Sequence, residues 1–352
     1  MMIVPSLCRL LRRRPATRRE TMMLKRRLAL KTLAGLGAAA SFDLAANRSF
    51  AESFPAKPVR VITPFPPGAG PDAALRIISD RLSKKWQQPV VVDNRPGGNG
   101  FIAVAAFKQG SADGYDLIEL DSSHITTHPH LFSNLPYNVA KDFAPLSMIL
   151  RTSFFVAVAA DSAYKALDDI VAAAKAAPSK INYGSWFVGS PGHLGGLRLQ
   201  EMTGTQMTHV PYRDFGQLYT AVANKELDWA LGSAASAGSM ERSGKIRFIA
   251  FAAAQRDKLY PNVPCTAESP TLRGYQVTGW AGVFAPRSAP QAVRDRIAAD
   301  IAEALRSPAV AERYAALGFE APDLSPQAFA DLINRETDAW AGVIRTASLR
   351  LD

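Results

Sequence analysis

The sequence predicts an α/β protein with two lobes. Strand-like and helix-like segments alternate along the chain from about residue 54, which favours helices packed in layers on sheets. A chain of 352 residues is long enough for two such domains with a substantial core. Two segments, around 149–152 and around 274–279, are predicted to carry the chain between the lobes.

The individual strands and helices follow from short local patterns. Apolar residues at intervals of three or four predict helices through 74–82 and through 293–305. Ser325 and Pro326 are typical of an N-cap and a first helical turn, so a last helix is expected there, and Gly318 would end the helix before it. Strands are predicted at 59–65, 90–94, 115–121, 154–160, 180–185, 208–212, 227–231, 246–252 and 277–285.

The stretch "VITPFPPGAGPD" at 61–72 predicts a strand, a glycine turn and the start of a helix. Exposed N–H groups in such a turn, together with the helix N-terminus, attract an anion without any charged side chain. The pattern Gly68-x-Gly70-x-x-Ala73, with Asp93 about twenty residues on, also matches a dinucleotide-binding motif. Prolines on both sides of the glycines stiffen the turn, however, so a nucleotide is the weaker interpretation.

The formal net charge of +10 comes almost entirely from residues 1–51, which hold eleven bases and two acids. The remaining residues have a net charge of about +1, so nothing indicates a nucleic-acid partner. The basic segment resembles an export signal. "KRRLALK" at 25–31 is similar to a twin-arginine motif, a short apolar run follows it, and "SFA" at 49–51 offers small residues for cleavage. We therefore expect a mature protein that begins near Glu52 in a bacterial periplasm.

The mature chain offers no clear catalytic or metal-binding set. Cys8 would leave with the leader and Cys265 would stand alone, which excludes an intramolecular disulfide and a cysteine-based metal site. His124, His128 and His130 have the density of a metal site, but their segment holds a proline and no adjacent carboxylate or thiolate, so loop and capping roles are preferred. Neither a nucleophile elbow nor a P-loop is complete. We expect no enzyme activity, no cofactor and no metal.

Residues 54–350 contain, in order, the phrases "KPVRVITPFPPGAGPDAALRI", "QPVVVDNRPGGNG", "ADGYDLIELDSSH", "LPYNVAKDFAPLSMI", "HVPYRDF", "GKIRFIAF" and "WAGVFAP". As an ordered set they resemble the substrate-binding proteins of tripartite tricarboxylate transporters, the Bug-type periplasmic receptors. The resemblance implies the type II periplasmic-binding-protein fold, in which two α/β lobes are joined by two crossover strands and close around a small ligand. Domain one would comprise 54–152 and 279–352, and domain two 153–278.

The resemblance also implies a ligand site at the lobe interface, held largely by backbone N–H groups and bridging waters. The implied contacts come from the turn after the first strand, from two further loops and from two segments of domain two. They are Phe65, Pro67, Gly68, Ala69, Gly70, Asp72, Ser122, Ser123, His124, Ser185, Trp186, Phe187, Val188, Ser190, Tyr212, Gly232 and Ser233.

Two departures from the family pattern bear on the ligand. The usual Gly-Gly-Gly-Thr-Asp turn is here "GAGPD" at 68–72, which removes one N–H donor and one hydroxyl. Trp186, Phe187 and Val188 stand where small polar residues are common. These three side chains either pack outward or in the hinge core, or they form an apolar wall for an aromatic or longer-chain carboxylate.

The implied function is that of a receptor that captures a small organic carboxylate, with aromatic and dicarboxylic acids as the candidates. It would deliver this ligand to a permease with large and small membrane subunits, and it is expected to be a monomer. Two alternatives stay open. One is an exported nucleotide-binding oxidoreductase, since twin-arginine export carries prefolded cofactor enzymes, and the other is an orphan or sensory receptor that serves a signalling partner.

Overall fold

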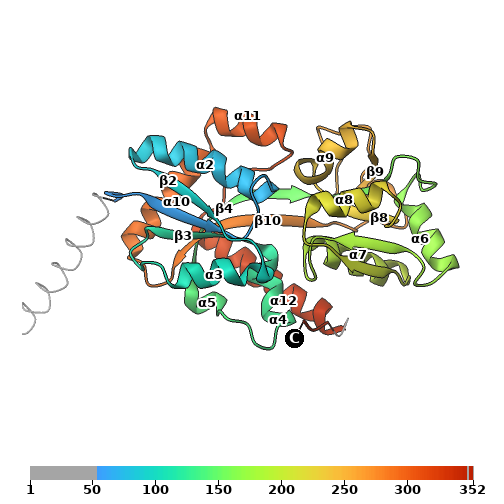
Figure 1. The fold of residues 1–352 in the computed structure, drawn as a ribbon, viewed down its shortest axis with the longest axis horizontal. Coiled ribbons are helices and arrows are strands. Elements are labelled where there is room, and N and C mark those ends of the chain that lie inside the picture. Colours follow the sequence, from blue (N-terminus) through green and yellow to red (C-terminus); the bar gives the residue numbers. More distant parts are fainter. Residues whose placement is uncertain (1–53, 347–348, 352) are drawn as a thin grey trace, which may run out of the picture. The chain divides into compact units, whose positions relative to one another are not determined.

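The computed structural model describes residues 54–346 and 349–351 (Figure 1). The predicted export signal and its cleavage site before Glu52 lie outside these residues. Within the described part of the chain, no helix is both long enough and apolar enough to cross a membrane. The fold is of the mixed α/β type, and its described strands form two five-stranded sheets.

The first sheet is built from both ends of the described chain. Its strand order is β2-β1-β3-β10-β4, in which β1 is parallel to β2 and β3, and β10 is antiparallel to β3 and β4. Its strands are β1 (Val59–Thr63), β2 (Val90–Asn94), β3 (Asp116–Asp121), β4 (Phe143–Ser153) and β10 (Thr278–Pro286). The longer helices that accompany it are α2 (Gly70–Trp86), α3 (Phe101–Lys108), α10 (Gln291–Leu305), α11 (Pro308–Ala316) and α12 (Pro326–Thr346).

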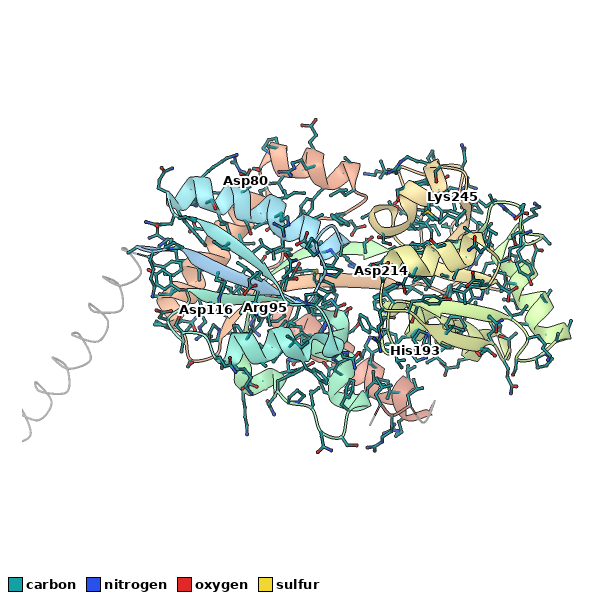
Figure 2. All side chains as sticks on the ribbon, in the orientation of Figure 1. Asp80, Arg95, Asp116, His193, Asp214 and Lys245 are labelled. Atoms are coloured by element: carbon teal, nitrogen blue, oxygen red, sulfur yellow. The ribbon has the colours of Figure 1, made fainter. Side chains whose placement is uncertain are left out.

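The second sheet repeats this plan with the order β7-β6-β8-β5-β9, again with an antiparallel strand in fourth position. Its strands are β5 (Phe155–Ala159), β6 (Asn182–Ser185), β7 (Thr208–Pro211), β8 (Trp229–Gly232) and β9 (Ile246–Phe251). Its helices are α6 (Leu167–Ala176), α7 (Pro191–Thr203), α8 (Phe215–Ala223) and α9 (Ala234–Arg242). Side-chain caps fix where helices begin: Asp214, labelled in Figure 2, accepts a hydrogen bond from the N–H of Gln217 at 3.0 Å and so starts α8.

The strand in fourth position of each sheet, β5 or β10, is the first strand after the chain has crossed between the sheets. β4 ends at Ser153 and β5 begins at Phe155, so the chain changes sheets within two residues. It returns after β9, where β10 pairs with β4 over a ladder from Thr278↔Ser153 to Pro286↔Phe143, and the two strands lie side by side in Figure 1. Both predicted crossovers are therefore present. The division into domains 54–152 plus 279–352 and 153–278 is compatible with this path and stays a prediction.

The sequence-based elements agree well with the structure. Each predicted strand is present, with its ends within two residues of those expected. Ser325 caps the last helix, since its Oγ accepts from the N–H of Ala328 at 3.1 Å, and Gly318 follows α11 with a φ of +68°. One strand was missed. β4 carries Pro145 and a polar Ser147 within its apolar run, and these residues obscure the strand pattern.

The predicted apolar stripes are the buried faces of their helices. Ala74, Ile78 and Leu82 on α2 and the corresponding residues of α10 pack with β1 and β4 in one core cluster. A second cluster, around Phe329 of α12, covers the other side of the same sheet. Burying one such aliphatic side chain contributes about 1.5–3 kcal/mol, so tertiary packing, more than intrinsic propensity, holds these helices in place.

A carboxyl group is buried inside the first sheet. Glu119 on β3 is 0% exposed, its Oε2 accepts a hydrogen bond from Thr63 Oγ1 at 2.6 Å, and its Oε1 has no partner among the described residues. Thr63 Oγ1 also accepts from the N–H of Phe65 at 3.3 Å, which ties this group to the turn after β1. Burial raises the pKa of Glu119 to about 8, against the lowering effect of the Thr63 hydrogen bond and with added repulsion from Asp72 and Asp121.

Replacing Glu119 by Gln should remove a pH dependence of stability. The folded state keeps the proton up to about pH 8, whereas the unfolded chain releases it near 4.5. Between these values the parent's free energy of unfolding therefore falls by about 1.4 kcal/mol per pH unit through this group. The stability of Glu119→Gln relative to the parent should rise from pH 5 to pH 8. Urea unfolding at both pH values measures this. If the free energy of unfolding changes equally in the two proteins between pH 5 and pH 8, Glu119 is not held protonated.

Candidate functional site

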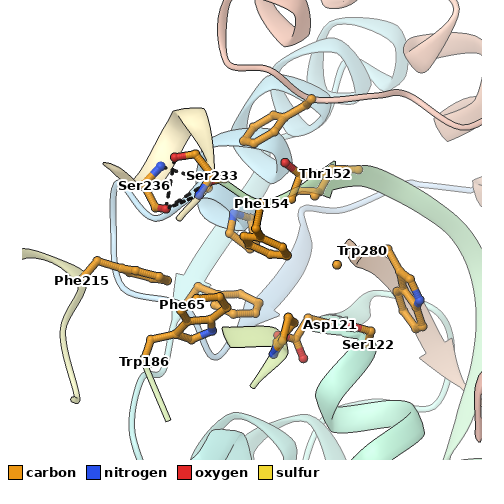
Figure 3. A pocket seen from close by; sticks show the side chains of 16 residues that line it. Phe65, Asp121, Ser122, Thr152, Phe154, Trp186, Phe215, Ser233, Ser236 and Trp280 are labelled. Carbon is orange, nitrogen blue, oxygen red and sulfur yellow. Dashed lines mark hydrogen bonds between the residues drawn. The ribbon is translucent and has the colours of Figure 1, made fainter. Parts of the chain in front are cut away.

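A cavity with about 530 Å³ of open space lies where elements of the two sheets meet (Figure 3). Elements of the first sheet contribute Phe65, Gly70, Pro71, Asp121, Ser122, Leu150, Thr152, Gly279, Trp280 and Phe319. Segments of the second sheet contribute Phe154, Trp186, Pro191, Phe215, Ser233 and Ser236.

Three helices begin at this cavity. Gly70 is the first residue of α2, Pro191 is the first residue of α7, and Ser233 is the N-cap of α9, and all three residues line the cavity. The free N–H groups of a first turn and the helix dipole both attract negative charge. No side chain caps α2, so its first N–H groups stay available to an external acceptor. The lining residues that the structure describes include no lysine or arginine. An anion here would be held by neutral donors.

Asp72 holds the turn between β1 and α2 from behind. Its carboxylate is 1% exposed and accepts hydrogen bonds from the N–H of Gly68 (2.9 Å), Asn94 Nδ2 (2.7 Å) and Arg76 Nε (3.0 Å). Burial alone would raise the pKa of Asp72, but these hydrogen bonds outweigh it and hold the pKa below its ordinary value. Gly68 has a φ of +85°, a left-handed conformation that favours glycine. Asp72 therefore shapes the turn and does not line the cavity.

Aromatic rings supply much of the cavity wall. The ring centroid of Trp186 lies 5.5 Å from that of Phe154 and 5.4 Å from that of Phe215, with the planes tilted by 36° and 37°. Trp280 is anchored from outside, since its indole N–H donates to Glu336 Oε2 at 2.7 Å. The aromatic lining residues are Phe65, Phe154, Trp186, Phe215, Trp280 and Phe319. Such a wall favours a ligand with an aromatic or otherwise apolar body.

The structure brings together part of the predicted site. Phe65, Gly70, Ser122, Trp186 and Ser233 line the cavity. Ser123 lines a neighbouring cavity of about 820 Å³ that shares Ser122 and Pro191 with the first. The other predicted contacts lie beside lining residues or behind them and do not border the first cavity: Pro67, Gly68, Ala69, Asp72, His124, Ser185, Phe187, Val188, Ser190, Tyr212 and Gly232.

Phe187, next to Trp186, makes a different contact. Its ring centroid lies 6.1 Å from that of His124 and 6.3 Å from that of His128, on the segment that follows β3. Close by, Thr127 Oγ1 donates to the carbonyl oxygen of Gly189 at 3.4 Å. The loop between β6 and α7 therefore rests on a segment of the first sheet. Phe187 contributes to the contact between the two halves of the protein, while Trp186 borders the cavity.

Two stacked histidines support this loop from the other side. The rings of His193, labelled in Figure 2, and His209 lie 4.0 Å apart. His209 Nε2 is 2.7 Å from Ser185 Oγ, and His193 Nδ1 accepts from the N–H of Gly189 at 3.0 Å. Burial lowers the pKa of His193 to about 3 and that of His209 to about 4. Both rings are therefore neutral at ordinary pH and act as hydrogen-bonding supports at the two ends of the loop.

The residues that suggested a metal or nucleotide site are engaged by other groups. Asp93, the acid of the dinucleotide pattern, accepts from Arg95 Nε at 2.9 Å and also faces Arg60. The histidines of the predicted cluster do not share one centre, and each has its own partner. The three contacts are His124 Nδ1–Asp121 Oδ1 (2.5 Å), His128 Nδ1–Tyr137 Oη (3.2 Å) and His130 Nε2–Thr337 O (3.1 Å).

Several lining residues were not foreseen. Asp121 could have been found, because it ends a predicted strand directly before Ser122, and strand ends commonly meet at a ligand site. Leu150, Thr152, Gly279 and Trp280 lie in or beside the two segments already expected to cross between lobes, and Pro71 lies in the turn predicted at 61–72. Nothing local in the sequence indicates the remaining ones, since the fold brings them in from distant segments: Phe154, Pro191, Phe215, Ser236 and Phe319.

Known proteins are similar to this chain in sequence and in fold. Residues 74–349 match the residue profile of the tripartite tricarboxylate transporter family receptor. Protein BugT of Bordetella pertussis is 30% identical over 305 residues, which cover 86% of this chain and 92% of BugT.

Two solved structures are similar to this one. R. palustris Rpa4515 with adipate has a TM-score of 0.80 and 28% identity, covering 85% of this chain and 100% of that one. MatC (Rpa3494) from Rhodopseudomonas palustris with bound malate has a TM-score of 0.75 and 27% identity, covering 83% and 100%. The family profile, the relative and the shared fold agree: this chain belongs to the tripartite tricarboxylate transporter family of receptors.

Proposed function

We propose that this receptor captures a small organic carboxylate with an aromatic or extended apolar body in the periplasm and delivers it to a tripartite tricarboxylate-type permease. One observation carries the proposal: three helix N-termini and a wall of aromatic rings border the same cavity, with no basic side chain among its described lining residues. Adipate and malate, the ligands in the two similar structures, are both carboxylic acids, which supports a carboxylate as the ligand's anionic group.

The carboxylate would lie at the start of α2. Gly70 N–H and the hydroxyl group of Ser122 are neutral donors at the cavity, and neutral hydrogen bonds have modest net strength. A receptor benefits from this, because its ligand must leave again for the permease. The apolar body would lie against Trp186 and Phe215. Burial of a ring face there supplies affinity without adding charge.

Capture would couple to closure of the two proposed domains, 54–152 plus 279–352 and 153–278, about the two crossings. The contact between Phe187 and the segment at His124 and His128 joins these domains in the present conformation. A ligand that touches both sides of the cavity favours this conformation by its differential affinity. The export signal predicted at 1–51 supports the periplasmic location, and the family supports large and small membrane subunits as partners.

Gly70→Val should abolish carboxylate binding. A Cβ at Gly70 would lie 3.4 Å from Phe319 and 3.8 Å from Ala235, so the two extra methyl groups of valine must occupy space beside the free N–H groups of α2. We expect affinity to fall by at least about a hundredfold in calorimetric titration with benzoate and adipate. Lys175→Ala, an exposed change on α6, is the control and should leave affinity unchanged. Binding by Gly70→Val at the parent level would show that the carboxylate does not lie here.

Trp186→Ala should weaken aromatic acids far more than aliphatic ones. Loss of a buried ring face removes about 1.5–3 kcal/mol, so benzoate should lose about ten- to a hundredfold in affinity while a short diacid changes little. Trp186 also packs on Phe154 and Phe215, so the melting temperature should fall as well. Trp186→Phe keeps a ring and should recover most of the benzoate affinity. Equal losses for both acids in Trp186→Ala would contradict a role in ligand contact.

Phe187→Ala should weaken every ligand to the same extent. Phe187 contacts His124 and His128 and does not line the cavity, so its loss should reduce the population of the closed conformation and not a particular ligand contact. We expect about a tenfold loss for benzoate and adipate alike. A selective loss for one acid, measured in the same titrations, would instead place Phe187 against the ligand.

A further inference from the structure

One acidic side chain borders the candidate ligand cavity. Asp121, the last residue of β3, lines it beside Ser122, and the described lining residues include no other carboxylate and no base (Figure 3). An acid is unexpected in a cavity that otherwise offers donors to an anion. Its position calls for a chemical reason beyond the carboxylate binding proposed above.

The hydrogen bonds of Asp121 are one-sided. Oδ1 accepts from the backbone N–H of His124 at 3.1 Å and lies 2.5 Å from His124 Nδ1. Oδ2 receives no hydrogen bond from any described residue. It is not fully buried, so it keeps some accessible surface. Because Asp121 lines the cavity, the free lone pairs of Oδ2 are available to a molecule inside it.

The groups around Asp121 leave Oδ2 without a donor. His124 is the partner of Asp121 and contacts it through Oδ1. Arg76 is hydrogen-bonded to Asp72. A second carboxylate of a ligand placed near Oδ2 would bring one acceptor against another, with no lysine or arginine among the described lining residues to bridge them, whereas an O–H or N–H group would find a ready acceptor.

We propose that Asp121 selects ligands that carry a hydrogen-bond donor, a hydroxyl or an ammonium group, on the apolar body in addition to the carboxylate. The inference rests on the proposed function, because it assumes a carboxylate bound at the helix N-termini. It narrows the ligand class to hydroxylated or amino-substituted aromatic monocarboxylates. It also predicts that this receptor disfavours dicarboxylates. In this it would differ from the two similar structures, which hold the dicarboxylates adipate and malate.

Calorimetric titration of the full chain with a matched acid series tests the proposal. The series is benzoate, 3- and 4-hydroxybenzoate, 4-(aminomethyl)benzoate and terephthalate. All of them carry a carboxylate on one benzene ring, and they differ in the second substituent. At least one acid with a donor should bind about tenfold more tightly than benzoate, which is the usual gain from one hydrogen bond to a charged group, and terephthalate should bind most weakly. The 3- and 4-substituted acids cover two directions, and the hydroxyl and ammonium arms identify which donor is preferred.

Asp121→Asn provides the matched variant. Asn keeps an Oδ1 acceptor for His124 but places an N–H₂ donor where Oδ2 stood, so the advantage of hydroxyl and ammonium groups should disappear and terephthalate should bind more tightly than it does to the parent. Benzoate, which has no such donor, is the reference acid for both comparisons. The control is Asp80→Asn on α2 (Figure 2), which removes one charge from an exposed ion pair with Lys84 and should preserve the parent's order of affinities.

The possible outcomes separate the two proposals. Equal affinities for benzoate, the hydroxybenzoates and terephthalate in the parent would overturn the role of Asp121 while leaving carboxylate capture intact. The same holds if Asp121→Asn keeps the parent's order of affinities. If no acid of the series and no aliphatic acid binds to the parent or to Asp80→Asn, the proposed function fails and this inference fails with it. The ranking in the parent needs no variant, so a folding defect in Asp121→Asn would not remove the test.

Discussion

The antiparallel pairing of β4 with β10 is the constraint on which the rest of the structure depends. This ladder, from Thr278↔Ser153 to Pro286↔Phe143, carries the chain out of the first sheet and back into it. Leu150 and Thr152 on one strand and Gly279 and Trp280 on the other also line the candidate cavity. The two strands thus connect the halves of the protein and form part of the cavity between them, so a ligand in this cavity would lie against both connections.

The electrostatics of the site come from the backbone more than from side chains. Three helix N-termini supply positive potential, and the buried carboxylate of Asp72 holds the turn that presents the first of them. Because no described lining residue is basic, the site can attract an anion without binding it as strongly as an arginine clamp would. Asp121 adds one acidic acceptor, so the described lining offers both neutral donors and an acceptor.

Two adjacent residues of the β6–α7 loop make different contacts. Trp186 borders the cavity, whereas Phe187 contacts the histidine-bearing segment after β3. Neutral His193 and His209 support the loop through Gly189 and Ser185, so both aromatic side chains are presented from a well-supported backbone. Ligand contact and interdomain contact are therefore linked through a few residues of one loop. In the proposed function, a ligand that contacts Trp186 would act on domain closure through this loop.

The local elements and the glycine turn after β1 could be derived from the sequence, because apolar periodicity, caps and glycine positions act over a few residues. The strand ends, the α2 and α10 stripes and the cap at Ser325 are of this kind. Resemblance to the family added the two-lobed fold, and Gly70, Ser122, Trp186 and Ser233 among the lining residues. The sequence could not distinguish Trp186 from Phe187, nor bring Phe215, Ser236 and Phe319 to one cavity. Only the tertiary structure decided this, because the orientation of a loop side chain and the meeting of residues from distant segments depend on how two sheets pack, which no local pattern encodes.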